Sequence, residues 1–256
     1  MIIQLDSKQL VFTADIHGDF AKLQQLIKPF TDTCFIVCGD CGFGFADTKY
    51  AKIQKMIKAN FDAGLEKRNN YLLFFRGNHD DPSYFEAPIK DYINTHRFRL
   101  IEDFTTIKVA GELVMCIGGA VSIDRRFRKV NSSYWFGEEI SYKNFDMHDY
   151  VGGELITILA THSAPRNYVS AYIPHPDWVR ISFDVDKKLT LDCDREDKVL
   201  ENMHKNYPAP KWIHGHYHFS NVQPIKVGEL ISLNINELYP IKNKDYYSEL
   251  QINTKE

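Results

Sequence analysis

Polar residues that could bind metal ions occur in five short clusters along the chain. Their side chains are carboxylates, imidazoles and one amide. In chain order the clusters are Asp15-x-His17, Gly39-Asp40, Gly77-Asn78-His79-Asp80, His162 and Gly215-His216-x-His218. Oxygen and nitrogen donors of this kind suit Mn, Fe, Zn or Ni rather than soft thiolate chemistry. The clusters therefore indicate a metal centre.

The spacing within two of the clusters favours convergence on one place. In an extended segment, residues i and i+2 point to the same side, so each of the two paired clusters can offer two donors together. The candidate ligands are Asp15, His17, Asp40, Asn78, His162, His216 and His218. Seven ligands are enough for two metals if one carboxylate bridges, and two neighbouring metals are the usual apparatus for in-line displacement at phosphorus.

Each cluster follows a predicted strand. The segments that connect the first three strands have apolar residues at helical spacing. The strands are Leu10–Ala14, Thr33–Cys38, Tyr71–Phe75, Glu154–Ala160 and Lys211–Ile213, and the helices are Phe20–Phe30 and Ala46–Arg68. A βαβαβ series with continuous apolar strands is typical of a parallel sheet covered on both faces. Open α/β sheets place ligands beyond the carboxyl ends of their strands, where the clusters lie.

The middle and the end of the chain change character. Two predicted hairpins and one helix occur there: Thr105–Ala110 with Leu113–Ile117, a helix near Glu138–His148, and Asn221–Lys226 with Glu229–Asn234. These antiparallel pieces predict a second sheet packed on the first. The fold class is therefore α/β.

Composition limits the class of protein. The 256 residues are 44% hydrophobic with a net charge of −3, and the sequence shows no linker, so we predict one domain over residues 1–256. Within it, residues 164–210 are predicted to be an insert that shapes the entrance of the site. The charge balance argues against a protein that coats nucleic acid or anionic membrane. The lack of a signal sequence or apolar span and the odd number of cysteines, five, predict a cytoplasmic protein without a membrane partner.

The five clusters, in this order, resemble the calcineurin-like metallophosphoesterases over residues 11–218. The resemblance implies a two-sheet α/β/β/α sandwich and two divalent metal ions (Mn, Fe, Zn, Ni or Co, with Mn favoured in vitro). One ion would take Asp15, His17, Asp40 and His218, and the other Asp40, Asn78, His162 and His216, with Asp40 bridging. The resemblance also implies that His79 is the catalytic proton donor and that Asp80 orients the His79 ring.

The function implied is hydrolysis of a phosphomonoester or phosphodiester by in-line attack of metal-bound hydroxide. The substrate would be a phosphorylated small molecule, a nucleotide or a phosphoprotein, with nucleic acid not favoured. A segment from Gly118 to Arg128 resembles a G-G-A-x-S-x-D-R stretch of some bacterial and phage-borne members. Arginines above a metal site grip phosphate oxygens, so Arg125 and Arg126 are predicted to bind substrate.

Three alternatives stay open. Ser/Thr protein phosphatases follow the bridging aspartate with V-D-R-G, whereas here Asp40 is followed by Cys-Gly-Phe-Gly, so that arginine is missing. A nuclease is supported only by the basic loop Arg125–Lys129. A metal-free scaffold on this fold should have lost ligands, and none is missing. Phe43 stands where purple acid phosphatases have a metal-binding tyrosine and one nuclease branch has a histidine, so no named branch is matched.

Overall fold

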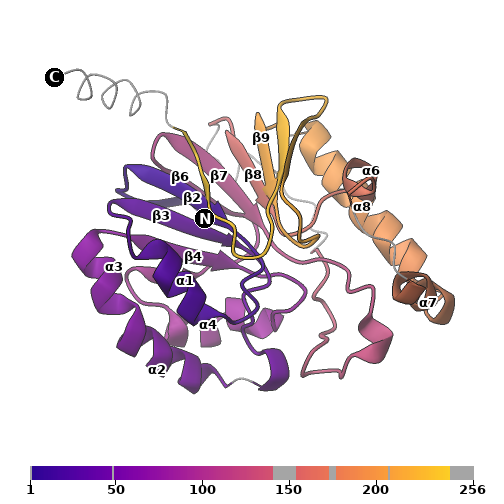
Figure 1. Ribbon diagram of the computed structural model, residues 1–256, viewed down its shortest axis with the longest axis horizontal. Helices are drawn as coiled ribbons and strands as arrows, with labels where there is room; N and C mark the ends of the chain where they lie inside the picture. Colours follow the sequence, from indigo (N-terminus) through magenta and orange to yellow (C-terminus); the bar gives the residue numbers. More distant parts are fainter. Residues whose placement is uncertain (1, 48, 141–153, 173–176, 207, 243–256) are drawn as a thin grey trace.

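The computed structural model describes residues 2–47, 49–140, 154–172, 177–206 and 208–242. Two β-sheets lie face to face, and helices cover the outer face of each (Figure 1). This four-layer arrangement confirms the predicted α/β/β/α sandwich. It brings strands from the two halves of the chain side by side.

The first sheet has five strands in the order β12-β2-β3-β4-β5. Its strands are β2 (Gln9–Thr13), β3 (Thr33–Cys38), β4 (Tyr71–Phe75), β5 (Phe98–Leu100) and β12 (Tyr239–Pro240). Strands β2 to β5 are parallel, and β12 pairs antiparallel with β2. The predicted βαβαβ series is confirmed, while the short strands β5 and β12 have no counterpart in the sequence interpretation.

The second sheet has seven strands in the order β1-β6-β7-β8-β9-β11-β10. They are β1 (Ile2–Gln4), β6 (Thr105–Val109), β7 (Glu112–Ile117), β8 (Ile158–Thr161), β9 (Lys211–His214), β10 (Asn221–Pro224) and β11 (Glu229–Ser232). The two predicted hairpins are confirmed as β6–β7 and β10–β11. Strands β7, β8, β9 and β11 are parallel neighbours, so this sheet is mixed.

Helices cover both outer faces. Those against the five-stranded sheet are α1 (Phe20–Ile27), α2 (Tyr50–Asn60), α3 (Asp62–Arg68) and α4 (Ile89–Ile93), with the 3₁₀ turns η1 (Phe45–Asp47) and η2 (Pro82–Phe85) nearby. The seven-stranded sheet is covered by α6 (Arg166–Val169) and α8 (Leu189–Asn206), with α7 (Asp177–Val185) beside α8 (Figure 1). A further 3₁₀ turn, η3 (Arg125–Phe127), lies in the connection after β7.

Two predicted helices differ from the structure. The helix expected over Ala46–Arg68 is broken twice: Ala46 has a left-handed backbone with φ of 53°, and Phe61, with φ of −114°, separates α2 from α3. Phe61 N still donates to Ile57 O and Leu65 N to Phe61 O, so the second break bends the helix. Of the helix expected near Glu138–His148, residues 138–140 are not helical and 141–148 lie outside the described residues.

Alternating side chains explain the continuous apolar strands. In β2, Leu10 and Phe12 pack into the core between the sheets, whereas Val11 packs toward α1 and its neighbours. In the seven-stranded sheet, Leu113 and Met115 pack toward α8, whereas Val114 packs between the sheets. Both faces of β2 and β7 are therefore covered, and these strands are held in one register.

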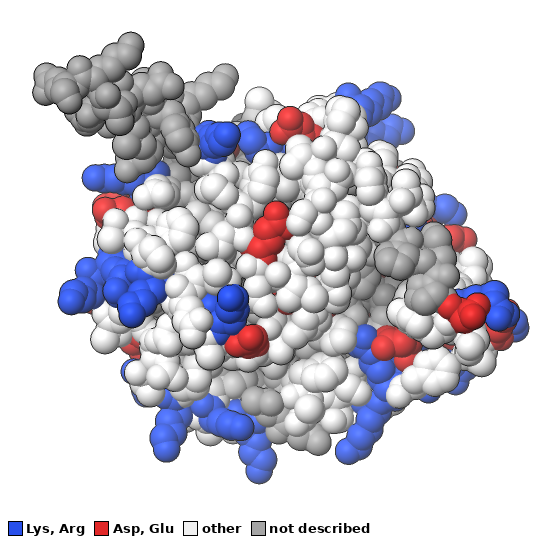
Figure 2. Space-filling view, viewed as in Figure 1, with Lys and Arg blue, Asp and Glu red and all other residues white. Residues whose placement is uncertain are grey.

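The surface in Figure 2 has Lys and Arg side chains scattered around its outline with acidic groups among them. Over the coloured part of this face, no broad basic surface is present. All five cysteines are free and buried, including Cys38 and Cys41. Among the described residues, no helix is long and apolar enough to cross a bilayer.

Candidate active site

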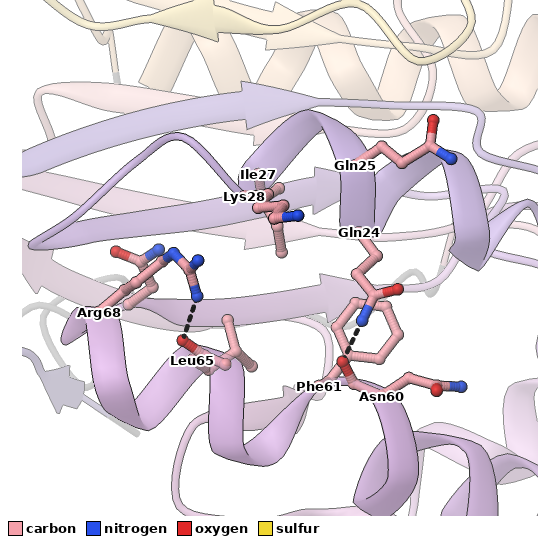
Figure 3. Close-up of a pocket in the computed structure, with 10 residues that line it drawn as sticks. Gln24, Gln25, Ile27, Lys28, Asn60, Phe61, Leu65 and Arg68 are labelled. Carbon is pink, nitrogen blue, oxygen red and sulfur yellow. Dashed lines mark hydrogen bonds between the residues drawn. The ribbon is translucent and has the colours of Figure 1, made fainter.

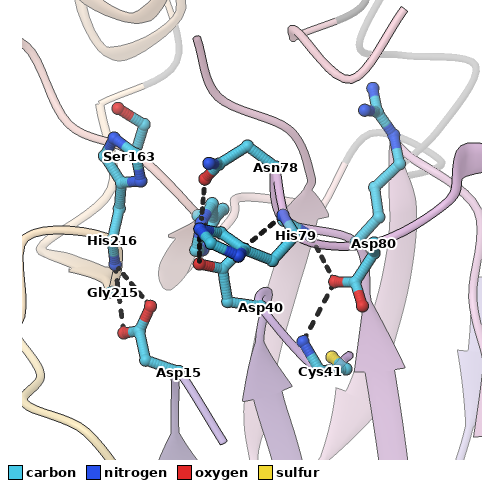
Figure 4. Close-up of polar contacts among 12 residues, drawn as sticks. Asp15, Asp40, Cys41, Asn78, His79, Asp80, Ser163, Gly215 and His216 are labelled. Carbon is cyan, nitrogen blue, oxygen red and sulfur yellow. Dashed lines mark hydrogen bonds and ion pairs between the residues drawn. The ribbon is translucent and has the colours of Figure 1, made fainter. Parts of the chain in front are cut away.

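The carboxyl ends of five strands meet at one place between the two sheets. Loops after β2, β3 and β4 come from the five-stranded sheet, and loops after β8 and β9 come from the seven-stranded sheet. Figure 4 shows Asp15, Asp40 and Asn78 from the first set turned toward His216 from the second. The structure thus gathers side chains up to 203 residues apart in sequence, the separation of Asp15 from His218.

The candidate ligands form two groups that share one carboxylate. The donor atoms of Asp15, His17, Asp40 and His218 all lie within 4.8 Å of one another, and so do those of Asp40, His162 and His216. Asn78 joins the second group, because its Oδ1 lies 3.1 Å from His162 Nε2. All seven predicted side chains are therefore brought together, in the same two sets that the resemblance implied.

The His162 ring is oriented by the backbone. Its Nδ1 donates to the carbonyl oxygen of Cys38 at 2.8 Å, which directs Nε2 to within 3.0 Å of Asp40 Oδ1. A histidine that ligates a metal usually donates its other ring nitrogen to a carbonyl or carboxylate in this way. The geometry leaves His162 Nε2 available as a ligand.

Two motif glycines make room for the ligands beside them. A Cβ on Gly77 would lie 2.2 Å from Asp40 Oδ1 and 2.7 Å from His162 Nε2, and one on Gly215 would lie 2.4 Å from Asp15 Oδ2. Real Cβ atoms do not approach other atoms so closely, so any side chain at either position would displace a donor. The glycines of the G-N-H-D and G-H-x-H clusters are therefore steric requirements of the site.

Five of the seven candidate ligands have a left-handed backbone. Their φ values are 55° for Asp15, 46° for His17, 50° for Asp40, 70° for His216 and 56° for His218. The extended conformation assumed for the two i, i+2 pairs is therefore wrong, although the pairs do converge. Non-glycine residues pay about 1–2 kcal/mol each for this conformation, and such strain clusters at functional sites.

The electrostatics of the cluster suit cations. Burial raises the pKa of Asp40, but the neighbouring His162, His79 and His17 outweigh it and hold that pKa well below its usual range. Burial lowers the pKa of His162, yet Asp40 overcomes this effect and raises it to about 9.

Two imidazole nitrogens also face each other, with His17 Nε2 3.2 Å from His218 Nε2. Such a contact requires a proton or a cation between the rings. The shared carboxylate, the facing nitrogens and the space left by Gly77 and Gly215 all fit two divalent metal ions.

His79 lies beside both groups and belongs to neither of them. Its Nε2 lies 3.8 Å from Asp40 Oδ2, and its ring stacks on Phe45 with the centroids 5.0 Å apart. Arg128 Nη2 donates to the same Nε2 at 2.8 Å. Burial is the main reason that the pKa of His79 falls to about 4. His79 is thus close to both groups without being a member of either, and its role as an unligated catalytic imidazole stays a prediction.

Asp80 does not make the predicted contact with the His79 ring. Its Oδ1 accepts from the backbone N–H groups of Gly42 and Phe43 at 2.7 and 2.8 Å, and its Oδ2 accepts from those of Cys41 and Gly77 at 3.0 and 2.8 Å. The carboxylate is fully buried, and burial raises its pKa to about 6. Asp80 therefore holds the loop after Asp40 to the loop after β4, rather than orienting a catalytic ring (Figure 4).

The two arginines predicted to bind substrate point elsewhere. Arg125 forms ion pairs with Asp186 at 2.6 Å and with Asp192 at 2.7 Å, and the Arg126 side chain is 64% exposed. Neither is among the described residues that line the cavity at the site, whereas Arg128 of the same segment is. The η3 turn points the first two arginines toward α7 and α8 and brings Arg128 onto His79.

Three residues at the site were missed by sequence reasoning. Ser122 Oγ accepts from Asn78 Nδ2 at 3.0 Å and from Arg128 Nη1 at 3.1 Å, so one hydroxyl links a candidate ligand to the arginine. Glu196 of α8 is buried and accepts from Val121 N and Ser163 Oγ, both at 2.7 Å. Only the G-G-A-x-S-x-D-R resemblance pointed toward Ser122 and Arg128, and no pattern in the sequence pointed toward Glu196.

A family model described as calcineurin-like phosphoesterase matches residues 8–220. The comparison with curated proteins gives no significant match.

Several solved structures are similar at low identity. Phosphopantetheinyl hydrolase from Mycobacterium tuberculosis is 13% identical, with 90% of each chain covered and a TM-score of 0.45. A novel archaeal phosphodiesterase is 13% identical, with 91% of this chain and 98% of that chain covered and a TM-score of 0.42. A third structure is 10% identical, with 92% of this chain and 98% of that chain covered. Its TM-score of 0.53 shows that the two chains share a fold.

Proposed function

The chain belongs to the calcineurin-like phosphoesterase family, and on this premise we propose that it hydrolyses a phosphate ester with the help of two divalent metal ions. One observation carries the proposal. The seven donors form two groups that share Asp40, so that two cations can be held as neighbours.

The residues divide between the two ions as follows. Asp15, His17, Asp40 and His218 would hold one ion, and Asp40, Asn78, His162 and His216 the other. When bound, the ions supply Lewis-acid chemistry: they neutralise phosphate oxygens and make a water nucleophilic near neutral pH. Mn²⁺ is the ion we would supply first in vitro, since the oxygen and nitrogen donors do not select one metal.

His79 would give a proton to the departing oxygen. The ring reaches the cavity, lies within 3.8 Å of Asp40 and is not needed as a ligand in either group. Burial keeps its pKa low in the structure described, and an anionic phosphate beside it would favour the charged imidazolium. Substrate binding itself would thus help to load the proton that is then transferred.

Arg128 would bind the phosphate. Its guanidinium makes four contacts: Nε pairs with Asp124 Oδ1 at 2.7 Å, Nη1 donates to Ser122 Oγ and, at 3.4 Å, to Ser133 O, and Nη2 donates to His79. A phosphate oxygen can replace His79 Nε2 as the acceptor of Nη2, which frees the histidine for proton transfer. The arginine therefore compensates for the missing V-D-R-G arginine from a different loop.

The substrate class stays a proposal. Phosphorylated small molecules and nucleotides remain candidates, and the protein phosphatase, nuclease and scaffold alternatives remain open. The cytoplasmic location and the insert over residues 164–210 likewise stay predictions. No observation favours any of these alternatives over a small-molecule phosphoesterase.

A paired assay tests the proposed activity. The protein is stripped of metal, supplied with Mn²⁺, and given p-nitrophenyl phosphate and bis-p-nitrophenyl phosphate. We expect metal-dependent release of nitrophenol from at least one substrate, and the ratio of the two rates assigns monoester or diester preference. If protein with bound metal hydrolyses neither compound, the scaffold alternative replaces the enzyme.

Two variants separate the roles of the site residues. Asp40→Asn should lose both metal and turnover, because Asp40 belongs to both groups. His79→Ala should retain metal while turnover falls about 10²–10⁴-fold, the usual share of a general acid. Metal content by elemental analysis and rates by the same assay distinguish the two. An unchanged rate in His79→Ala on a substrate with a poor leaving group would remove the proton-donor role.

A further inference from the structure

One cavity joins the candidate metal site to an apolar chamber beneath α7. It has a volume of about 670 Å³ and includes Asp40, Asn78, His79, His216 and His218 at one end. The remaining lining comes from the segment after β7, from α6 and the turn after it, from α7 and α8, and from the loop after β9. Its apolar members include Val121, Ile123, Trp178, Val179, Phe183 and Phe219. Any ester whose phosphate sits at the donors must place its organic group in or beside this chamber.

The charged groups that line the chamber leave no surplus positive charge. Two arginines, Arg128 and Arg166, stand against three carboxylates, Asp124, Glu196 and Asp197. Arg166 is engaged, because its Nε donates to Asp197 at 2.8 Å and its Nη2 donates to Asp194 at 2.5 Å. Arg128 is the cation that we assign to the reacting phosphate itself. A second phosphate or a carboxylate inside the chamber would therefore meet acidic groups without a matching cation.

We propose that the chamber binds the organic part of the substrate, and that this part is an uncharged and largely apolar group such as an aryl or alkyl group. The proposal rests on the proposed function for the position of the phosphate. A volume of about 670 Å³ lies within the range of small-molecule sites. Removing apolar surface of the substrate from water favours binding in this chamber.

Polymers fit this chamber poorly. The neighbouring phosphates of a nucleic acid, or the acidic flanks of many phosphopeptides, would need cations that the chamber does not provide. The side chains of Trp178, Val179 and Phe183 provide few hydrogen-bonding partners. A polar group buried among them would lose its hydrogen bonds to water, so a substituent with few such groups binds better. The substrate is thus a small phosphate ester rather than a macromolecule.

A second groove on the molecule serves as a contrast. It lies between α1 and the α2–α3 pair, has a volume of about 250 Å³ and is lined mostly by polar side chains such as Gln25, Lys28 and Arg68 (Figure 3). Gln24 Nε2 already donates to Asn60 O across it. None of the candidate ligands lines this groove. A change at exposed Gln25 therefore provides a control far from the proposed chamber.

Direct binding to the Mn²⁺-loaded protein tests the proposal without turnover. Isothermal titration calorimetry would compare methylphosphonate, 1-naphthylphosphonate and 4-carboxyphenylphosphonate, which share a head group that cannot be hydrolysed. We expect the naphthyl compound to bind at least about tenfold more tightly than the methyl compound, the effect of one to two well-buried carbons or more. The carboxyphenyl compound should bind more weakly than the naphthyl one. Equal affinities, or no binding of any of the three, overturn the proposal.

Variants on one helix locate the effect. Val179→Asp introduces a charge into the chamber, whereas Ile181→Asp places the same charge on an exposed position of α7 that does not line it. We expect Val179→Asp to weaken naphthylphosphonate about tenfold or more and leave methylphosphonate unchanged. Ile181→Asp and Gln25→Ala should change neither. Phe183→Ala, which removes chamber wall without adding charge, provides the same comparison if Val179→Asp does not fold, as judged by circular dichroism.

The two proposals can fail separately. If naphthylphosphonate binds selectively and no phosphate ester is hydrolysed, the proposed function is wrong and the chamber assignment stands. If phenyl phosphate and 1-naphthyl phosphate are hydrolysed with equal kcat/KM and the phosphonates show equal affinities, the enzyme stands and the chamber assignment is wrong. The chamber assignment is supported if wild type binds 1-naphthylphosphonate more tightly than methylphosphonate and if Val179→Asp or Phe183→Ala removes this difference.

Discussion

Asp80 shows how a residue next to a candidate catalytic histidine, His79, can stabilise the loops around it. Its two carboxylate oxygens accept four backbone N–H groups from the loops that carry Asp40 and Asn78. Hydrogen bonds to a buried charged group are worth about 1.5–3 kcal/mol each, and unsatisfied buried donors cost further free energy. Asp80 therefore fixes where the two ligand loops stand relative to each other.

Replacing Asp80 should reduce stability. We expect Asp80→Ala to lower the free energy of unfolding by about 3–5 kcal/mol, measured by urea titration, because three buried N–H groups and one partly buried N–H group lose their acceptor. The neighbouring Asp81→Ala is the matched control. Asp81 accepts from Ser83 N at the start of η2, so its loss should cost only about 1 kcal/mol. A stable Asp80→Ala protein with a reduced kcat alone would restore the ring-orienting role.

Arg128 provides a second prediction for a single residue. In Arg128→Lys the ammonium cannot contact Ser122, Asp124 and a phosphate in one planar arrangement. We expect kcat/KM to fall about tenfold or more, with weaker competitive inhibition by inorganic phosphate. Arg126→Lys is the control, since Arg126 is largely exposed and does not line the cavity. Equal losses in the two variants would argue that loop charge alone matters.

The candidate ligands were easier to predict than the contacts that the side chains near them make. The seven candidate positions follow from short motifs placed after strands, and parallel strands bring their carboxyl ends together. The partners of Asp80, Arg125 and Arg128 depend on the turns of the loops between them. Periodic patterns in the sequence do not reveal the conformation of such turns.

Elements were predicted well where burial imposed a pattern. Strands β3 and β4 have the expected bounds, Thr33–Cys38 and Tyr71–Phe75, because both faces of each strand are covered. The break at Phe61 was missed for a physical reason. Ile53, Ile57, Phe61 and Leu65 are all buried, so a spacing of four residues continues through the bend. Short edge strands such as β12 carry too few residues to show a pattern.

The connection after β7 contains a group whose charge should affect stability. Glu138 is 1% exposed, and burial raises its pKa to about 8, whereas an unfolded glutamate has a pKa of about 4.3. Between these values the folded protein holds a proton that the unfolded chain releases. Stability should therefore fall as the pH rises from about 4 to about 8, by up to about 1.4 kcal/mol per pH unit from this group.

Glu138→Gln tests this effect. Glutamine keeps an acceptor oxygen for Ser122 N or Trp135 N but does not titrate. Thermal midpoints recorded from pH 4 to pH 8 should fall less steeply in the variant than in wild type, with the two proteins most alike near pH 4. Parallel curves would show that Glu138 does not hold its proton in the folded protein.

At the scale of the whole molecule, the donor groups join the two sheets. Asp15, His17 and Asp40 follow strands of the five-stranded sheet, whereas His162, His216 and His218 follow strands of the seven-stranded sheet. A cation bound by either group therefore contacts both sheets at once. Since such a site exists only when the sheets are packed together, metal binding should favour the folded state.

Metal removal should accordingly lower thermal stability. At a free metal concentration of 1,000 times Kd, binding to the native state adds about 4 kcal/mol. We expect treatment with a chelator to lower the melting temperature by several degrees, and Mn²⁺ to restore it, as followed by scanning calorimetry. Asp40→Asn should show little response to either treatment. Unchanged melting of wild type after complete removal of metal would contradict a site shared by the sheets.

The left-handed backbone at five candidate ligands affects which substitutions such a protein could accept during evolution. His218 is partly exposed and has a φ of 56°, a conformation that glycine adopts without cost. His218→Gly should therefore raise the stability of the metal-free protein by about 1 kcal/mol while weakening metal binding, measurable by urea titration and metal analysis. A lineage released from selection for catalysis would gain robustness by losing these side chains first. At these five positions, metal binding and the stability of the metal-free protein should therefore change in opposite directions.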